Sequence, residues 1–330
     1  MLLSVVVPVY GCADCLVALR ESLAKSLASV TDSYELIFVD DRSKDNAWAV
    51  LQGLCKDDAR VRAFRLSRNF GQHAAISAGL AMARGSRAVV MDCDLQDPPD
   101  LIPTLYAKAD EGFDIVLARR LARPSWGRLV LSRVYSRLMK LFFGVEMSGD
   151  FANLSVISRR VVDAYLSMGD LDRHYILILQ WLGFDHTTIE FQQPERHAGR
   201  SSYTLGALIR LGMDGMFFQT TTLLTWIVYL GFAVALSGLV LAIVFIYIYL
   251  THSPYPFPGY TSLAVLILLT GGFIIISTGV TGLYIGKIFQ QVKGRPLYVI
   301  DEAFSEAAAQ TGADEEPDEG PPIARTSRSR

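Results

Sequence analysis

Acidic side chains crowd one short segment of the chain. The ten residues "MDCDLQDPPD" contain Asp92, Asp94, Asp97 and Asp100, and they follow "SRAVV", a run typical of the end of a buried strand. Two like charges about 4 Å apart repel by roughly 4 kcal/mol at the effective dielectric of a protein surface. The crowding therefore calls for compensation by a basic side chain, by solvent or by a metal ion.

The spacing of these acids favours a metal ion. Side chains two residues apart on an extended strand point the same way, so Asp92 and Asp94 can face one ligand, and Gln96 adds a neutral oxygen. Carboxylate and amide oxygens suit Mg²⁺ or Mn²⁺, and Mg²⁺ is often shared with substrate phosphates. A lone DxD is common in solvated turns, but a second acidic pair, Asp40 and Asp41, also follows an apolar strand. The sequence therefore predicts a divalent metal site.

Short apolar strands alternate with helical patterns over the first 120 residues. The expected strands are 2–10, 34–41, 61–67, 87–92 and 113–120, and the expected helices are 14–30, 43–55, 71–85 and 100–112. This alternation predicts a mostly parallel, doubly wound α/β sheet, in which ligands bind beyond the carboxyl ends of the strands. Both acidic pairs lie at such ends. No GxGxxG follows the first strand, so a Rossmann dinucleotide site is not supported.

Two long apolar stretches predict a transmembrane hairpin over residues 211–294. No Asp, Glu, Lys or Arg occurs between Gly215 and Gly286, a gap that soluble domains do not leave. Three prolines in "THSPYPFPGY" divide the gap into candidate spans at 221–250 and 261–286. Each span exceeds the ~20 helical residues that cross ~30 Å of hydrocarbon. Two successive buried core helices are the less favoured alternative.

Basic residues flank the predicted hairpin, and its connecting loop has none. The flanking residues are Arg200 and Arg210 before the first span, and Lys287, Lys293 and Arg295 after the second. The positive-inside rule therefore places both flanks in the cytoplasm. The N-terminus lacks the basic start of a signal peptide, so residues 1–210 are expected to form a cytosolic domain.

The four cysteines, Cys12, Cys15, Cys55 and Cys93, would then lie in a reducing compartment, where no disulfide is expected. Cys12 and Cys15 form a CxxC, which suits a redox or zinc site. A zinc site needs a second close pair, and Cys55 and Cys93 are far apart in sequence. We therefore interpret the four residues as ordinary small buried side chains.

Two further segments are expected to adjoin the hairpin. Residues 126–143, "WGRLVLSRVYSRLMKLFF", include Arg128 and predict a basic amphipathic helix at the membrane surface. The alternative is a helix packed on the sheet with a solvated basic face. Residues 295–330 are interpreted as a cytosolic juxtamembrane segment followed, after Ile300, by the polar tail "EAAAQTGADEEPDEGPPIARTSRSR" at 306–330, which is expected to be disordered. The net charge of −2 gives no indication of nucleic acid, and no nucleic-acid partner is expected.

Five motifs resemble, in order and spacing, those of polyprenyl-phosphate glycosyltransferases of glycosyltransferase family 2: "VVVPVYG", "VDDRSKDN", "LSRNFGQHAAISAGL", "MDCDLQDPPDLIP" and "RHAGRSSY". Over residues 4–300 the chain is similar to the two-span bacterial branch that loads a sugar onto undecaprenyl phosphate, and dolichyl-phosphate mannose synthase is a related enzyme. The resemblance implies a GT-A fold and a UDP- or GDP-linked sugar donor. It also implies a role in cell-envelope glycan synthesis at the bacterial cytoplasmic membrane, and assembly as a homo-oligomer.

The resemblance assigns roles to individual residues. The implied nucleotide-sugar contacts are Pro8, Tyr10, Asp40, Asp41, Asp92 and Arg196. The helix start adds Asn69 and Gly71, because a helix N-terminus suits phosphate. The implied metal ligands are Asp92, Asp94 and Gln96. The residues expected near the acceptor phosphate are Arg119, Arg128 and Arg200, and those at the reacting centre are Asp94, Asp150 and Arg119.

Two positions depart from the family pattern. Gly11 and Cys12 replace the usual Asn-Glu after Tyr10, which leaves no Glu there to contact a nucleotide. Ser202 replaces the Lys of the usual "GxSKY", and Arg200, two residues away, is the candidate to supply the missing charge.

The expected chemistry is direct displacement at the anomeric carbon with inversion. A lipid phosphate is already ionised near neutral pH, because its second pKa is about 6, so it needs little help from a base. Asp150 would then orient or polarise the acceptor. The metal would neutralise the leaving nucleoside diphosphate, and arginines would bring the two anionic substrates together.

Other functions stay open at this point. A metal-dependent phosphohydrolase of lipid diphosphates also uses clustered acid, and a membrane scaffold or lipid carrier needs no chemistry. A processive polysaccharide synthase is disfavoured, because a QxxRW signature is absent and two spans are too few for a conduit.

Overall fold

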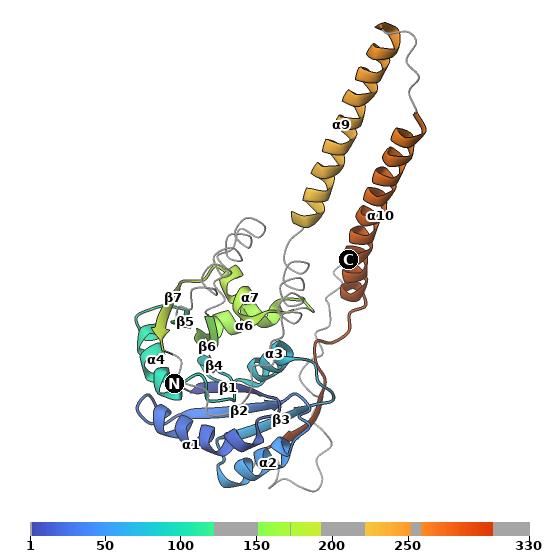
Figure 1. Cartoon of the computed structure of the whole chain (residues 1–330). Helices are drawn as coiled ribbons and strands as arrows, with labels where there is room; N and C mark the ends of the chain where they lie inside the picture. Colours follow the sequence, from blue (N-terminus) through green and yellow to red (C-terminus); the bar gives the residue numbers. More distant parts are fainter. Residues whose placement is uncertain (1, 122–150, 172, 193–221, 252–258, 306–330) are drawn as a thin grey trace, which may run out of the picture. The chain divides into compact units, whose positions relative to one another are not determined.

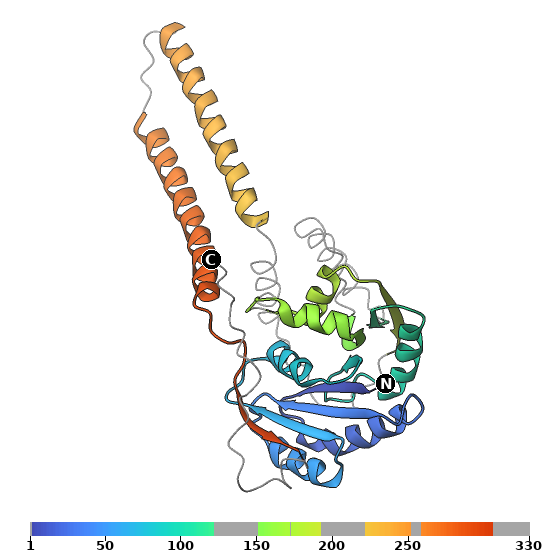
Figure 2. The same cartoon turned by 180° about the vertical axis from the view of Figure 1, so that it is seen from behind.

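The computed structural model describes residues 2–121, 151–171, 173–192, 222–251 and 259–305. Its chain divides into two compact units (Figures 1 and 2). One unit holds Met1–Pro124, Ser148–Gly199 and Arg295–Arg330, and the other holds Ser125–Met147 and Arg200–Gly294. The C-terminal segment thus belongs with the N-terminal part of the chain, from which the sequence-based boundaries separated it.

The first unit is built on a sheet whose described strands have the order β7-β5-β6-β4-β1-β2-β3-β8. The strands are β1 (Leu3–Val9), β2 (Tyr34–Asp40), β3 (Val61–Leu66), β4 (Arg87–Val90), β5 (Ile115–Arg120), β6 (Phe151–Ser158), β7 (His186–Phe191) and β8 (Ile300–Phe304). β1 pairs in parallel with both β2 and β4, whereas β6 and β8 run antiparallel to their neighbours. The mostly parallel, doubly wound sheet is confirmed, and all five predicted strands are present.

Helices cover both faces of this sheet (Figures 1 and 2). One core contains residues of α1 (Leu16–Leu27), α2 (Ala47–Asp57) and α4 (Ile102–Asp110), and the other contains residues of α3 (Gln72–Met82), α6 (Arg159–Ser167) and α7 (Tyr175–Trp181). Successive side chains of a strand point to opposite faces, so Val5 and Val7 of β1 enter the first core and Val6 the second. The four predicted helices are α1 to α4. The short 3₁₀ turns η1 (Ala13–Cys15) and η2 (Pro99–Leu101) precede α1 and α4.

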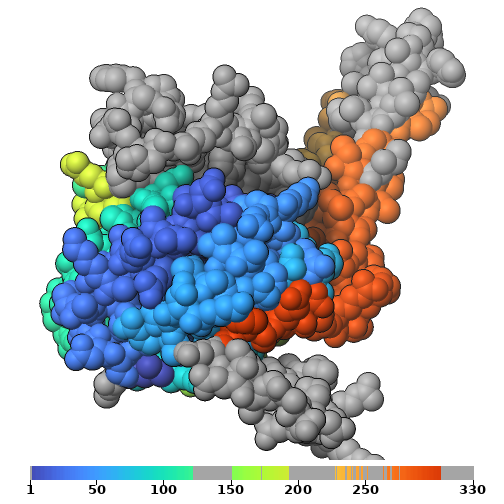
Figure 3. Space-filling model, turned by 90° about the horizontal axis from the view of Figure 1, so that it is seen from below, coloured from blue at the N-terminus to red at the C-terminus, as the bar shows by residue number. Residues whose placement is uncertain are grey.

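The C-terminal segment supplies the edge strand β8, which pairs with β3 and lies against the N-terminal part of the chain (Figure 3). Glu302 accepts a hydrogen bond from Trp48 Nε1 at 3.0 Å and pairs with Arg65 at 3.2 Å. The polar tail predicted at 306–330 lies outside the described residues. Three of the five β8 side chains are exposed, so its composition is that of a solvated segment even though its backbone is paired.

The second unit contains two long helices, α9 (Thr222–Thr251) and α10 (Gly259–Val292), in the order predicted for the hairpin. Within the described residues, Thr270–Val292 is the one stretch that is long and apolar enough to cross a membrane, and Tyr229–Gly238 is a shorter apolar helix. The membrane crossing itself stays a prediction. The amphipathic helix predicted at 126–143 lies outside the described residues.

Close backbone approach fixes the start of β4 beside β1. A Cβ on Gly85 would lie 2.7 Å from three backbone atoms, the carbonyl oxygens of Arg87 and Leu2 and the nitrogen of Ser4. The Gly85 N–H also donates to Ser4 Oγ at 2.8 Å. Backbone atoms in paired strands cannot move aside, so only glycine fits here.

We predict that Gly85→Ala lowers the thermal unfolding midpoint, because overpacking of this kind costs about 1–3 kcal/mol. Gly53→Ala is the matched control, since a Cβ on Gly53 in α2 meets nothing within 4 Å. Removing a glycine from a helix interior gains about 0.5–1 kcal/mol, so the control unfolds at or above the wild-type temperature. The midpoints are measured on the full chain in detergent. A wild-type midpoint for Gly85→Ala would contradict the packing argument.

Candidate active site

A pocket lies where the sheet changes its direction of winding, between β1 and β4. β2 pairs with β1 on one side and β4 pairs with it on the other, so the loops that follow these strands diverge. This point is where open α/β sheets bind ligands. The pocket has a volume of about 400 Å³ and is lined by Pro8, Val9, Tyr10, Gly11, Cys12, Asp41, Asn69, Gly71, Gln72, Asp92, Cys93 and Asp94.

Most of the predicted donor-contacting residues that the structure describes line this single pocket. They are Pro8, Tyr10, Asp41, Asn69, Gly71 and Asp92, and the predicted metal ligand Asp94 lines the same pocket. They come from the ends of four different strands, so the fold brings together residues that are far apart in sequence. The Tyr10 side chain is half exposed, which leaves its ring available to a ligand.

Asp41 ties the end of β2 to the loop before α3. Its carboxylate accepts hydrogen bonds from the backbone N–H groups of Phe70 at 2.7 Å and Gly71 at 2.8 Å. Burial raises the pKa of Asp41, while these two N–H donors lower it. Gly71 has φ +97°, a conformation that favours glycine. Asp41 therefore sets the shape of the pocket wall at the start of α3.

Asp40 is fully buried and does not line the pocket. Its Oδ1 accepts from the Ser43 N–H at 2.9 Å, and its Oδ2 lies 3.2 Å from Arg65 Nε. Ser43 Oγ in turn accepts from the Gly11 N–H at 3.2 Å. Asp40 therefore supports the loop after β1 indirectly, through Ser43. The predicted contact between Asp40 and a nucleotide stays a prediction.

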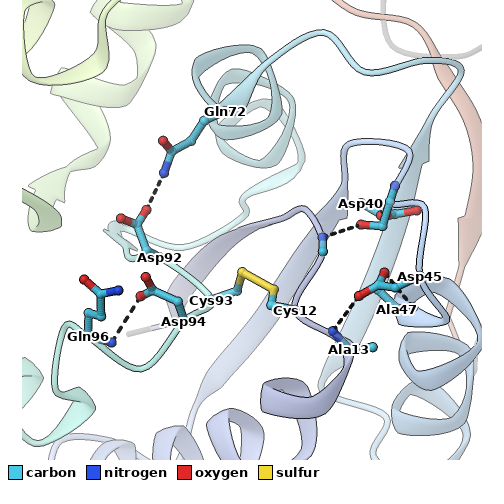
Figure 4. The surroundings of a disulfide bond; sticks show 12 residues. Cys12, Ala13, Asp40, Asp45, Ala47, Gln72, Asp92, Cys93, Asp94 and Gln96 are labelled. Carbon is cyan, nitrogen blue, oxygen red and sulfur yellow. Dashed lines mark hydrogen bonds between the residues drawn. A yellow bond between two sulfur atoms is a disulfide. The ribbon is translucent and has the colours of Figure 1, made fainter. Parts of the chain in front are cut away.

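Two side-chain amides hold the Asp92 carboxylate. Asn153 Nδ2 of β6 donates to its two oxygens at 3.0 and 3.2 Å, and Gln72 Nε2 at the start of α3 donates to Oδ1 (Figure 4). Burial, followed by the charge of Asp97, raises the pKa of Asp92 to about 6. Neither amide was predicted from the sequence. Gln72 follows the predicted phosphate-binding Gly71, but no pattern in the sequence distinguishes Asn153.

The four clustered aspartates have different partners. Asp97 is fully buried and pairs with Arg120 at 2.9 Å, and Asp100 accepts from Ser26 Oγ at 3.0 Å. Within the described part of the chain, no ion pair joins Asp92 or Asp94 to a basic side chain at salt-bridge distance. These two carboxylates accept hydrogen bonds from neutral N–H groups, which leave their negative charge for a cation to compensate.

Asp94 and Gln96 lie in the same loop as Asp92, beside it (Figure 4). Asp94 Oδ1 accepts from the Gln96 backbone N–H at 3.1 Å across Leu95, which has φ +58°. The described residues contain no group of three His, Cys, Asp or Glu arranged to hold a metal. A cation here would bind two carboxylates and an amide oxygen, with the remaining ligands supplied by a substrate. That donor set suits Mg²⁺ or Mn²⁺.

The predicted acceptor-side residues are only partly described. Arg119 on β5 lies 3.7 Å from Glu190 of β7 and is not among the residues that line the pocket, so its role stays a prediction. The other predicted acceptor-side residues, Arg128 and Arg200, fall outside the described ranges. So do Asp150, predicted at the reacting centre, and Arg196, predicted to contact the nucleotide sugar.

A disulfide joins Cys12 to Cys93 across the base of the pocket (Figure 4), and the expectation of no disulfide is wrong. The two residues are 81 apart in sequence, and their Cα atoms are 6.6 Å apart. Each lies three residues beyond its strand, and the parallel pairing of β1 with β4 brings these strand ends together. The expectation rested on the compartment alone and ignored this proximity.

The class of the protein follows from its relatives. Residues 4–166 match the family described as Glycosyl transferase family 2. A glycosyltransferase of Synechocystis sp. is 33% identical over 305 residues, which cover 92% of this chain and 95% of that protein. The chain belongs to glycosyltransferase family 2 and is a glycosyltransferase, as its motifs predicted.

More specifically named proteins are also similar. The undecaprenyl-phosphate 4-deoxy-4-formamido-L-arabinose transferase of Serratia proteamaculans is 34% identical over 317 residues, covering 95% of this chain and 97% of that protein. Among solved structures, glucosyl-3-phosphoglycerate synthase from Mycobacterium tuberculosis in complex with Mn²⁺ and UDP-glucose has a TM-score of 0.45 and 19% identity, covering 67% of this chain and 78% of that chain.

We predict that Asn153→Ala weakens Mn²⁺-dependent binding of UDP or GDP by roughly 10- to 100-fold. A hydrogen bond to a charged group contributes about 1.5–3 kcal/mol, and each 1.4 kcal/mol is about tenfold. Asn46→Ala is the control, because Asn46 precedes α2 without making a side-chain capping bond. Titration calorimetry on the full chain measures both variants. Wild-type affinity in Asn153→Ala would show that Asp92 needs no such support.

Proposed function

We propose that the protein transfers a sugar from a nucleotide-sugar donor to the phosphate of a membrane polyprenyl phosphate. The observation that carries this proposal is the pocket at the β1–β4 switch point, which Asp92 and Asp94 line together with Tyr10 and Asp41. The name of the Serratia relative, which the chain covers almost completely, supports undecaprenyl phosphate as the acceptor. The apolar stretch Thr270–Val292 is consistent with work at a membrane.

The pocket offers separate surfaces to the two ends of a nucleoside diphosphate. Pro8, Tyr10 and Asp41 form the side expected to hold the nucleoside. Gly71 and Gln72 lie at the N-terminus of α3, where backbone N–H groups and the helix dipole favour phosphate. The donor would therefore lie across the loops after β1 and β4, with its diphosphate toward the acidic loop.

Asp92, Asp94 and Gln96 would hold Mg²⁺ or Mn²⁺ at that loop. The raised pKa of Asp92 reflects buried negative charge that a cation would offset. When bound, the metal acts as a Lewis acid that stabilises the charge of the leaving nucleoside diphosphate. Gln72 and Asn153 keep the Asp92 carboxylate oriented, so the ligand set is arranged before the donor arrives.

The acceptor needs positioning more than activation. Its phosphate is ionised near neutral pH, so an oxygen can attack the anomeric carbon directly and invert it. Asp150 is proposed to orient this acceptor. The arginines proposed to bring the two anions together are Arg119, Arg128, Arg196 and Arg200. Anchoring the active site at the membrane leaflet that contains the acceptor lipid confines the encounter between enzyme and acceptor to the membrane surface.

The proposed setting follows from the apolar helices. We place α9 and α10 in the bacterial cytoplasmic membrane, with the sheet domain and the C-terminus in the cytosol and the chain self-associated as a homo-oligomer. The flanking basic residues favour this orientation.

The full chain in undecaprenyl-phosphate-containing vesicles tests the proposal against a panel of labelled UDP- and GDP-sugars. We expect label in the lipid fraction with one or a few donors, loss of transfer with EDTA, and its return with Mg²⁺ or Mn²⁺. Free phosphate released without lipid labelling would instead indicate a phosphohydrolase. A product anomer that matches the donor anomer would rule out a single inverting displacement.

We predict that Asp94→Asn lowers lipid labelling by at least about 100-fold, since metal stabilisation of the leaving group is worth several kcal/mol and each 1.36 kcal/mol is about tenfold. Asp57→Asn, at the exposed C-terminal end of α2, is the matched control and keeps wild-type activity. Equal activity in the two variants would remove Asp94 from the site.

A further inference from the structure

The disulfide between Cys12 and Cys93 connects the two walls of the candidate donor pocket. Cys12 follows Gly11 in the loop after β1, and Cys93 stands between Asp92 and Asp94 (Figure 4). Both cysteines are themselves among the residues that line the pocket. The bond therefore lies between the side proposed for the nucleoside and the side proposed for the metal.

A free thiol lies next to this bond. The Cys15 N–H donates to the Cys12 carbonyl oxygen at 3.0 Å in the turn of η1, so the two residues of the CxxC motif are one turn apart. Cys15 is free and half-buried, whereas the other free cysteine, Cys55, is fully buried in α2. A CxxC next to a disulfide gives an exchange partner for thiol chemistry.

The loop that carries Cys93 contains a strained residue, so its conformation is expected to change when the disulfide is reduced. Leu95, two residues further on, has φ +58°, and the left-handed region costs an L-residue other than glycine about 1–2 kcal/mol. The disulfide anchors this loop to the loop after β1, beyond Gly11 at φ +69°. Opening it removes a restraint between two segments that both face the ligand.

We propose that Cys12 and Cys93 form a reversible thiol–disulfide site that sets the affinity of the pocket for its metal–nucleotide ligand. The inference rests on the proposed function. The oxidised pair holds Asp94 and Tyr10 in the arrangement described above, so binding orders fewer groups. The reduced pair frees the two loops, and affinity falls.

A cytosolic dithiol is the reductant in this thiol–disulfide exchange. Its thiolate attacks one sulfur of the Cys12–Cys93 bond, forms a mixed disulfide and releases the other cysteine as a thiolate, which takes up a proton. The second thiol of the reductant then displaces the remaining cysteine. Two electrons and two protons pass to the protein, which ends with two thiols, and the reductant ends as a disulfide. Oxidation by a small-molecule disulfide reverses the steps.

The test compares one protein in two states. Full-length wild-type chain in detergent is oxidised with a small-molecule disulfide, or reduced with a dithiol that is then removed, and alkylation with mass spectrometry counts the free thiols. Calorimetry measures binding of Mn²⁺ with UDP and with GDP. We expect reduction to weaken binding by about three- to tenfold, the range given by ordering one or two side chains, and reoxidation to restore it.

Two variants separate the disulfide from general effects. Cys93→Ala is expected to bind with the affinity of the reduced protein under both conditions, and Cys55→Ala to retain the response to reduction. Equal or tighter binding by the reduced wild type overturns the proposal, as does failure of the bond to form on oxidation. Absence of metal-dependent nucleotide binding in either state would count against the proposed function instead.

Discussion

The pairing of β1 with two parallel neighbours is the constraint on which the rest of the structure depends. Val9 stands opposite Asp40 on one side, and Val6 stands opposite Val90 on the other. This register brings the residues after β1, β2 and β4 to one edge of the sheet, where all the pocket residues from these strands lie. α3 packs closely over β1, since a Cβ on Gly79 of α3 would lie 2.3 Å from Val6 Cγ1.

The pocket brings the half-buried Asp92 close to other carboxylates, an arrangement that folding alone would not favour. Arg120 neutralises Asp97, but the described partners of Asp92 are neutral amides, and burial raises the pKa of Asp92. Such a conflict between local stability and composition is typical of a functional site. The amides orient the carboxylate without cancelling its charge, which preserves its attraction for a cation.

Some strands of the sheet could be predicted from the sequence, and others could not. The parallel strands are continuous apolar runs, so β1 to β5 and the acids at their ends were found by pattern alone. β6, β7 and β8 were missed, and each of them pairs with a strand far away in the chain. Asn153 reaches Asp92 only through the register of β6 on β4, and no local pattern encodes that register. The Cys12–Cys93 bond was missed for the same reason: it depends on strand adjacency.

The edge strand β8 has a consequence for how the protein is made. β3 ends at Leu66, but its partner β8 begins only at Ile300, after α10. Until then, the nascent chain carries an unpaired strand edge, which is prone to pair with other chains. That edge can close only once residues 300–304 have been synthesised. A chain truncated before residue 300 would thus be prone to aggregate, although the strands that form the pocket are already present.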